Sequence, residues 1–147
     1  MDMDDVKTFS IAEANSLLPV LRKLTGTLEI HHAEILSLQA QIDALELIID
    51  KDRKENSPND EELATLTKKL NNCGVNFKEI VENIQSYGCH LKGISPTLID
   101  FFHAHDGHIV YLCWKSDEDA VAHWHEVSKG FNDRQPVTEL GSSDHLL

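Results

Sequence analysis

Apolar residues in the first part of the chain recur at alternating spacings of three and four. One run consists of Leu21, Leu24, Leu28, His31, Ile35, Leu38, Ile42, Leu45 and Ile49, and a second consists of Leu63, Leu66, Leu70, Cys73, Phe77, Ile80, Ile84 and Tyr87. This spacing places all members of a run along one side of an α-helix. We therefore predict two long helices, each carrying a heptad seam.

Local signals mark where these helices begin and end. Ser10 and Glu13 have the spacing of a capping box, in which each side chain accepts a hydrogen bond from the other residue's backbone amide. Pro19 fits only the first turn of a helix, so it predicts a break immediately before it. The polar stretch 52–60 predicts the turn between the long helices, and Gly88 predicts the C-cap of the second.

Residues 10–88 are therefore expected to form a long antiparallel coiled-coil helical hairpin. Matching the two runs places Leu38 near Cys73 and His31 near Ile80. His31 is the polar residue of the first run. It serves either to satisfy a neighbour and fix the register or to bind a ligand.

Some apolar residues of the hairpin lie outside the seam, including Leu47 and Ile48. Exposed apolar surface favours association between copies of a chain. We therefore expect a homodimer formed through the helical hairpin.

The pattern changes after Gly88, where the heptads stop. Segments 98–103 and 109–114 are rich in β-branched and aromatic residues, and the Asp106-Gly107 pair between them is typical of a tight hairpin turn. Segment 120–127 is either a third strand, because Val121, His123, His125 and Val127 share one parity, or a short helix.

The expected fold class is α+β, mainly α, with a small antiparallel β module at residues 89–137 packed against the hairpin. A length of 147 residues suits a single domain, 1–147. The polar stretch 138–147 is expected to be a flexible tail.

Composition narrows the choice of partners and compartment. A formal charge of −12 opposes binding to nucleic acid or to an anionic membrane. There is no apolar run of membrane-spanning length and no signal peptide at the N-terminus, so we expect a cytosolic protein without membrane contact. Three cysteines without a paired spacing are expected to be reduced and mostly buried.

Two His-x-His units suggest metal binding, namely His103-Ala104-His105 and His123-Trp124-His125. Residues two apart on a strand point to the same side, so each unit offers two imidazoles to one ion. Such a site suits zinc, iron or nickel, and an oxygen ligand would come from Asp100, Glu118 or Glu126. The alternative is that these histidines are structural or solvated, because so short a motif often occurs without function.

Aromatic and basic residues add a candidate ligand pocket. Trp114 and Trp124 either line such a pocket or pack in an aromatic core. Arg134 either binds a carboxylate or other anion through its planar guanidinium or pairs with Asp100 or Glu118. Cys113, between Leu112 and Trp114, is expected to be an inert buried thiol rather than a nucleophile.

Two regions of the chain also carry a family pattern. The first runs from Phe9-Ser10 through Glu13-Ala14-Asn15 to Leu17-Leu18-Pro19. The second comprises Lys92, 98–101, Gly107, 110–114, Glu118, Trp124-His125, Gly130 and 134–136. In these residues the chain resembles a bacterial family of uncharacterised proteins, domain of unknown function 2203.

The resemblance brings no established activity, but it changes the weight of individual residues. The family pattern includes positions that match Asp100, Trp114, Glu118, His125 and Arg134. It usually has a Pro-Ala pair in place of Phe102-His103 and an aromatic residue in place of His123, so a four-histidine site would be peculiar to this chain. The resemblance favours a cluster of Asp100, Glu118, His125 and Arg134, which would hold a metal, bind a polar ligand or form a buried network.

We therefore predict one of two functions. The first is a non-enzymatic binding or assembly protein, in which the hairpin is the association surface and the pocket contains Asp100, Trp114, Glu118, Trp124 and Arg134. The alternative is a metal-binding protein or metal-dependent hydrolase, with ligands drawn from His125, Glu118, Asp100, His123 and His103. The sequence lacks a Gly-rich phosphate loop, a Gly-x-Ser-x-Gly elbow and a His-Glu-x-x-His helix, which favours the first.

Overall fold

The structure is a computed structural model that describes residues 6–52 and 58–140. A pair of long helices is followed by a five-stranded antiparallel sheet, which confirms the predicted α+β, mainly α, fold class. The helices are α1 (Ile11–Ser16), α2 (Leu18–Asp52) and α3 (Pro58–Ser86). The remaining elements are β1 (His90–Gly93), β2 (Leu98–His105), β3 (His108–Lys115), β4 (His123–Glu126), η2 (Phe131–Asp133), β5 (Gln135–Pro136) and η3 (Val137–Leu140).

The first helical turn forms as the capping box predicts. Ser10 Oγ accepts a hydrogen bond from the Glu13 amide at 3.0 Å, and Glu13 Oε1 accepts one from the Ser10 amide at 2.9 Å. The chain breaks at Leu17, which caps α1, and α2 begins at the next residue. Pro19 therefore lies in the first turn of α2, where its missing N–H costs no helical hydrogen bond.

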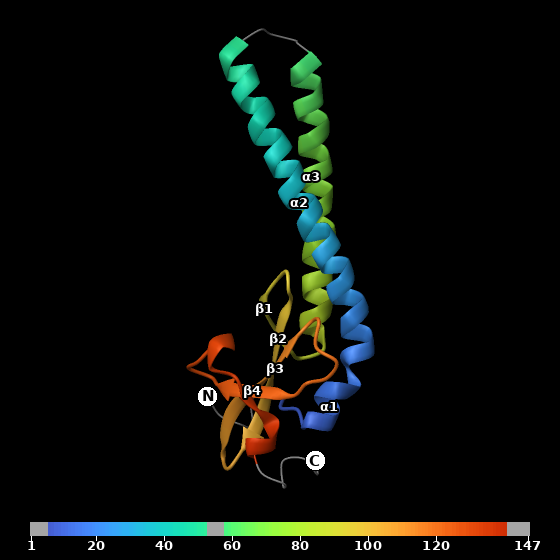
Figure 1. The fold of residues 1–147 in the computed structure, drawn as a ribbon. Helices are drawn as coiled ribbons and strands as arrows, with labels where there is room; N and C mark the ends of the chain where they lie inside the picture. Colours follow the sequence, from blue (N-terminus) through green and yellow to red (C-terminus); the bar gives the residue numbers. More distant parts are fainter. Residues whose placement is uncertain (1–5, 53–57, 141–147) are drawn as a thin grey trace.

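Helices α2 and α3 lie side by side, and their upper halves extend well beyond the sheet (Figure 1). The upper part is held together by a cluster of buried seam residues, namely Leu38, Ile42, Leu45, Leu66 and Cys73. This cluster contains both members of the predicted Leu38 and Cys73 pair. Residues 53–57 of the predicted turn lie outside the described residues.

The sheet is built on the tight turn between β2 and β3. Asp106 and Gly107 have positive φ angles of 47° and 81°, as expected at both central positions of a type I′ hairpin turn. This turn sets the register of β2 against β3, so that Asp100 is paired with Cys113. β4 pairs with β3, placing His125 opposite Tyr111, and the segment 120–127 therefore contains a strand rather than a helix.

The two faces of the sheet have different surroundings. Ile99, Phe101, Leu112 and Trp114 are buried in the main core, together with Leu21, Leu28 and Ile84 of the hairpin. Because side chains alternate along a strand, Asp100, Tyr111, Cys113 and His125 lie on the opposite face. The helices thus cover one face and leave the polar face away from them.

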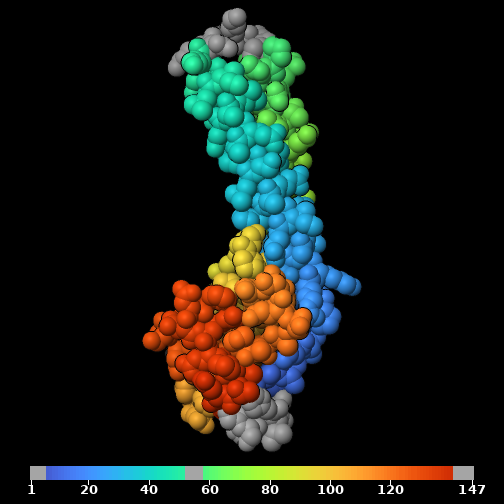
Figure 2. Space-filling view, viewed as in Figure 1, coloured from blue at the N-terminus to red at the C-terminus, as the bar shows by residue number. Residues whose placement is uncertain are grey.

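The hairpin is also fixed to the sheet by a polar contact. Glu29 Oε2 on α2 accepts hydrogen bonds from Thr97 Oγ1 and Ser116 Oγ, each at 2.9 Å. Thr97 is fully buried, so its hydroxyl depends on this partner. In the space-filling view, the sheet and the lower part of the hairpin form a thick body from which the upper hairpin projects (Figure 2).

The C-terminal end differs from the sequence prediction. The chain from 138 to 140 is not a loose tail, because it belongs to η3 and Leu140 is buried in the main core. Residues 141–147 of the predicted tail lie outside the described residues. Among the helices that the structure describes, none is long and apolar enough to cross a membrane.

Candidate functional site

The polar face of the sheet carries a buried pair of ionisable side chains. His125 Nε2 lies 3.2 Å from Asp100 Oδ2, and each residue is only 3% exposed. Asp100 lies on β2 and His125 lies on β4, with β3 between these two strands. Burial removes the water that would otherwise solvate these groups, so their contacts within the protein determine their state.

The hydrogen bonds of His125 indicate which kind of atom or ion can lie between its imidazole and the Asp100 carboxylate. Its Nδ1 atom is 2.8 Å from the Glu126 carbonyl oxygen, which can only accept, so Nδ1 carries a proton. A neutral ring would then present the Nε2 lone pair to the Asp100 carboxylate. Two acceptors at this distance require a cation between them, which is either one further proton or a metal ion.

Cys113 completes the group. Its Sγ, His125 and Asp100 each offer a ligand atom, and the three atoms lie within 4.8 Å of one another. Burial raises the pKa of Cys113 to about 12, with a further contribution from the Asp100 carboxylate. The other carboxylate oxygen, Asp100 Oδ1, is buried and has no hydrogen-bond partner within residues 6–52 and 58–140.

A cavity of about 220 Å³ opens beside these three residues. The sheet contributes its floor, formed by Leu98, Asp100, Tyr111, Cys113 and His125. The rest of its lining, here called the rim, comes from Lys92 of β1 and from Val127, Lys129, Gly130 and Phe131, which follow β4. The Lys92 ammonium lies 3.4 Å from the Tyr111 hydroxyl, so one rim lysine is held over the floor.

A second polar group lies next to the first. Arg134 binds Glu118 through two hydrogen bonds of 2.9 and 3.0 Å, and His123 Nδ1 lies 3.5 Å from Glu118 Oε2. Burial alone would raise the pKa of Glu118, but the bonds from Arg134 and the Lys115 amide lower it below its ordinary value. Arg134 also lies near enough to Cys113 to oppose the rise in the thiol pKa.

The predicted cluster of Asp100, Glu118, His125 and Arg134 is thus arranged as two pairs. One pair is Asp100 with His125, and the other is Glu118 with Arg134. Cys113 adjoins both pairs, because Asp100 raises the pKa of its thiol and Arg134 lowers it. The Glu118 carboxylate is therefore already paired with Arg134, whereas Asp100 and His125 face the cavity.

The predicted contribution of His103 to this site is wrong. His103 is paired with Val110 and lies on the face of the sheet that the core covers, with only 1% exposure. Its Nδ1 is 2.7 Å from the Phe9 carbonyl oxygen, which ties the N-terminal segment to the second strand. The two His-x-His units consequently face opposite sides of the sheet, and they do not form one four-nitrogen site.

The two tryptophans predicted to bind a ligand also lie on the core face. Trp114 is fully buried, and its Nε1 donates a hydrogen bond of 3.0 Å to the Glu118 carbonyl oxygen. Trp124 packs against the same core. The interpretation as aromatic core therefore fits both residues better than a role in lining the cavity.

Sequence reasoning assigned Cys113 no ligand role and missed the rim lysines, Lys92 and Lys129. The Asp106-Gly107 turn could have shown the position of Cys113. In a hairpin with a two-residue turn, the numbers of any two paired residues have the same sum. Counting back from the turn places Cys113 opposite Asp100. The lysines gave no such signal, since Lys92 reaches the cavity only because β1 pairs with β2, and Lys129 only because the segment after β4 folds beside the sheet.

Comparison with known protein families finds a match over most of the chain. The model of a family described as uncharacterized conserved protein (DUF2203) matches residues 7–137. This span includes both the hairpin and the whole sheet. No curated protein and no solved structure matches the chain.

Proposed function

The chain belongs to the DUF2203 family of uncharacterized conserved proteins, and we propose that it binds a transition-metal ion through Asp100, Cys113 and His125, with a small anionic ligand in the adjoining cavity. The observation that carries this proposal is the convergence of a carboxylate, a thiol and an imidazole within 4.8 Å on one buried face of the sheet. This donor set suits zinc, which binds nitrogen, sulfur and oxygen together.

The second hydrogen bond of His125 supports the metal role. A histidine that binds a metal commonly donates its other ring N–H to a carbonyl or carboxylate, which fixes the ring and makes the free nitrogen available. Here Nδ1 is held by the Glu126 carbonyl oxygen, and Nε2 is directed toward Asp100. The thiol favours zinc, nickel or iron over magnesium or calcium, which prefer oxygen ligands.

The cavity gives the ion a place for a further ligand. Three protein side chains leave one position of a tetrahedral zinc site for water or a small molecule, as in catalytic zinc sites. Lys92 and Lys129 stand at the rim, although the chain as a whole carries a charge of −12. This local positive charge favours a carboxylate or phosphate ligand.

Metal-dependent hydrolysis is the class of activity that this arrangement favours. A cysteine nucleophile suits the geometry less well, because neither ring nitrogen of His125 is assigned to the thiol. A nucleophilic cysteine also requires a lowered pKa, whereas that of Cys113 is about 12. In this proposal Cys113 is therefore a ligand whose proton the metal displaces.

The test is metal analysis of protein purified without an affinity tag, followed by zinc titration of matched variants. His125→Gln and Asp100→Asn are expected to bind one equivalent fewer than the parent. His123→Gln belongs to the same His-Trp-His segment but faces Glu118, so it is expected to keep the full stoichiometry. Equal zinc binding by the parent and His125→Gln would overturn the proposal.

We also propose self-association of the hairpin as a separate function. Its support is the exposure of apolar side chains on α2, with Leu36 at 58%, Leu47 at 71% and Ile48 at 48%. Sedimentation velocity tests this directly. A concentration-dependent dimer that Leu47→Lys dissociates is expected, and a monomer at all concentrations would refute it.

A further inference from the structure

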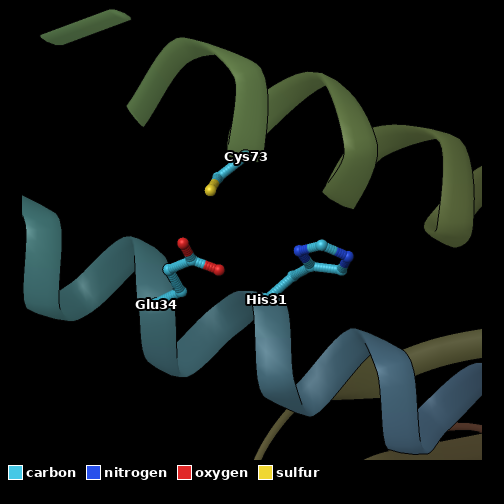
Figure 3. Close-up of side chains that lie close together, drawn as sticks. All are labelled: His31, Glu34 and Cys73. Carbon is cyan, nitrogen blue, oxygen red and sulfur yellow. The ribbon is translucent and has the colours of Figure 1, made fainter. Parts of the chain in front are cut away.

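The helical hairpin contains a second group of side chains of the types that can bind a metal ion, far along the chain from the sheet site. His31 and Glu34 lie on α2, and Cys73 lies on α3. Figure 3 shows the imidazole and the carboxylate directed toward α3, with the thiol of Cys73 directed toward α2. Each residue offers a ligand atom, and these atoms lie within 4.8 Å of one another.

This group lies where the apolar packing of the hairpin changes. Below it, Leu28 and Phe77 belong to the main core that includes the sheet. Above it, Leu38 and Leu70 belong to the separate upper cluster, which also contains Cys73. The hairpin seam thus has a polar interruption between two apolar clusters.

The three residues differ in how deeply their side chains are buried. Cys73 is 8% exposed, and the Nδ1 atom of His31 is buried without a hydrogen-bond partner in the described part of the chain. Glu34 is exposed and therefore connects the group to solvent. A buried imidazole nitrogen without a partner is unfavourable, and a cation bound to it would remove that cost.

We propose that His31, Glu34 and Cys73 form a second transition-metal site, which links α2 to α3 across the hairpin. His31 and Glu34 are three residues apart on one helix, a spacing that places both side chains on the same face. Cys73 supplies the ligand from the other helix, so a bound ion joins the two. Nitrogen, sulfur and oxygen ligands again suit zinc, with solvent at the fourth position beside Glu34.

A link of this kind is reversible. The sulfur–metal bond forms as the thiol gives up its proton to solvent, and it breaks when the proton returns. The stiffness of the hairpin would then depend on the metal supply, which is a property separate from the chemistry of the sheet site.

Cobalt titration of the full-length Cys113→Ser variant tests the proposal, because this background removes the thiol of the sheet site. We expect a thiolate-to-cobalt charge-transfer absorption that saturates at one thiolate-bound cobalt per chain. Adding Cys73→Ser should abolish the band, while adding Cys89→Ser should preserve it, since Cys89 hydrogen-bonds to the Ile84 carbonyl oxygen instead. His31→Gln leaves the thiol in place and should weaken cobalt binding at least about tenfold.

Helicity measured by circular dichroism shows which variants remain folded. A Cys113→Ser protein without the band, or a band that survives both Cys73→Ser and His31→Gln, would overturn the hairpin site. The single Cys73→Ser variant retains the sheet site, so failure of one proposal is distinguishable from failure of the other.

Discussion

Cys113 lies directly opposite Asp100 across β2 and β3, and both side chains face away from the helical hairpin. His125 reaches the same point from β4, at 3.2 Å from the Asp100 carboxylate. Three residues that are distant in sequence therefore meet because a short antiparallel sheet aligns them. The core on the other face holds the strands in this register and leaves the polar face available for a ligand.

Metal affinity at the sheet site should fall as the pH is lowered. The pKa of Cys113 is about 12, so its thiol is protonated near neutral pH and each bound ion must displace that proton. One displaced proton corresponds to about a tenfold loss of affinity for each unit by which the pH falls. Competition titrations at a series of pH values measure the slope of the logarithm of metal affinity against pH. Cys113→Ser should lower this slope by the one unit that corresponds to one displaced proton. An unchanged slope would contradict a thiolate ligand.

Glu118 should make the fold sensitive to acid. Its pKa in the folded protein lies below the ordinary value of 4.5, so its stabilising effect is complete above about that pH. The effect is lost as the pH falls further, through the folded-state pKa, because protonation breaks the bond to Arg134. Glu118→Gln should cost about 1–3 kcal/mol of unfolding free energy at pH 7 and less at low pH.

Urea unfolding at several pH values checks the Glu118 prediction. The exposed Glu139→Gln is the matched control, because it changes the same charge elsewhere in the C-terminal segment. A stability difference between wild type and Glu118→Gln that stays constant from neutral to acidic pH would contradict the assignment.

Removing the polar contact between hairpin and sheet should destabilise the whole protein. Glu29→Ala leaves the buried Thr97 hydroxyl without its acceptor, at a cost of about 1–3 kcal/mol. Denaturant unfolding measures the loss, and the exposed Glu46→Ala on the same helix should change the stability by less than about 0.5 kcal/mol. Equal effects of the two substitutions would show that Glu29 contributes only helix propensity.

The rim lysines should control anion binding without controlling metal binding. Replacing both Lys92 and Lys129 by Gln is expected to weaken binding of phosphate to the zinc-loaded protein by about tenfold, because two nearby positive charges are removed. Calorimetric titration of phosphate measures this change. Lys68→Gln, on the exposed face of α3, should have no effect, and zinc stoichiometry should be unchanged in all of these variants.

The sequence predicts the hairpin well because one physical property determines it. The apolar residues of α2 and α3 must share one side of each helix, and the spacing of Leu38, Ile42 and Leu45 shows this directly. The same holds for the β2–β3 hairpin, whose Asp106-Gly107 turn determines its register. A local sequence pattern is enough to predict an element whose structure is determined by residues close together in the chain.

The candidate site depends on contacts that no local pattern records. The four residues of β4 do not reveal in sequence that they pair with β3, which is what brings His125 to Asp100. Alternation along β2 places His103 on the same face as Ile99 and Phe101, but no local pattern shows that its imidazole bonds to Phe9, a residue 94 positions away. Leu140 is likewise a single apolar residue in a polar stretch, and only the packed core shows that it is buried.

The most direct test of the sheet site is zinc X-ray absorption spectroscopy of the Cys73→Ser variant loaded with one equivalent of zinc. This variant lacks the thiol of the hairpin site and retains Asp100, Cys113 and His125. We expect one sulfur at about 2.3 Å together with nitrogen and oxygen ligands at about 2.0–2.2 Å. A zinc shell of nitrogen and oxygen alone, unchanged by Cys113→Ser, would contradict it.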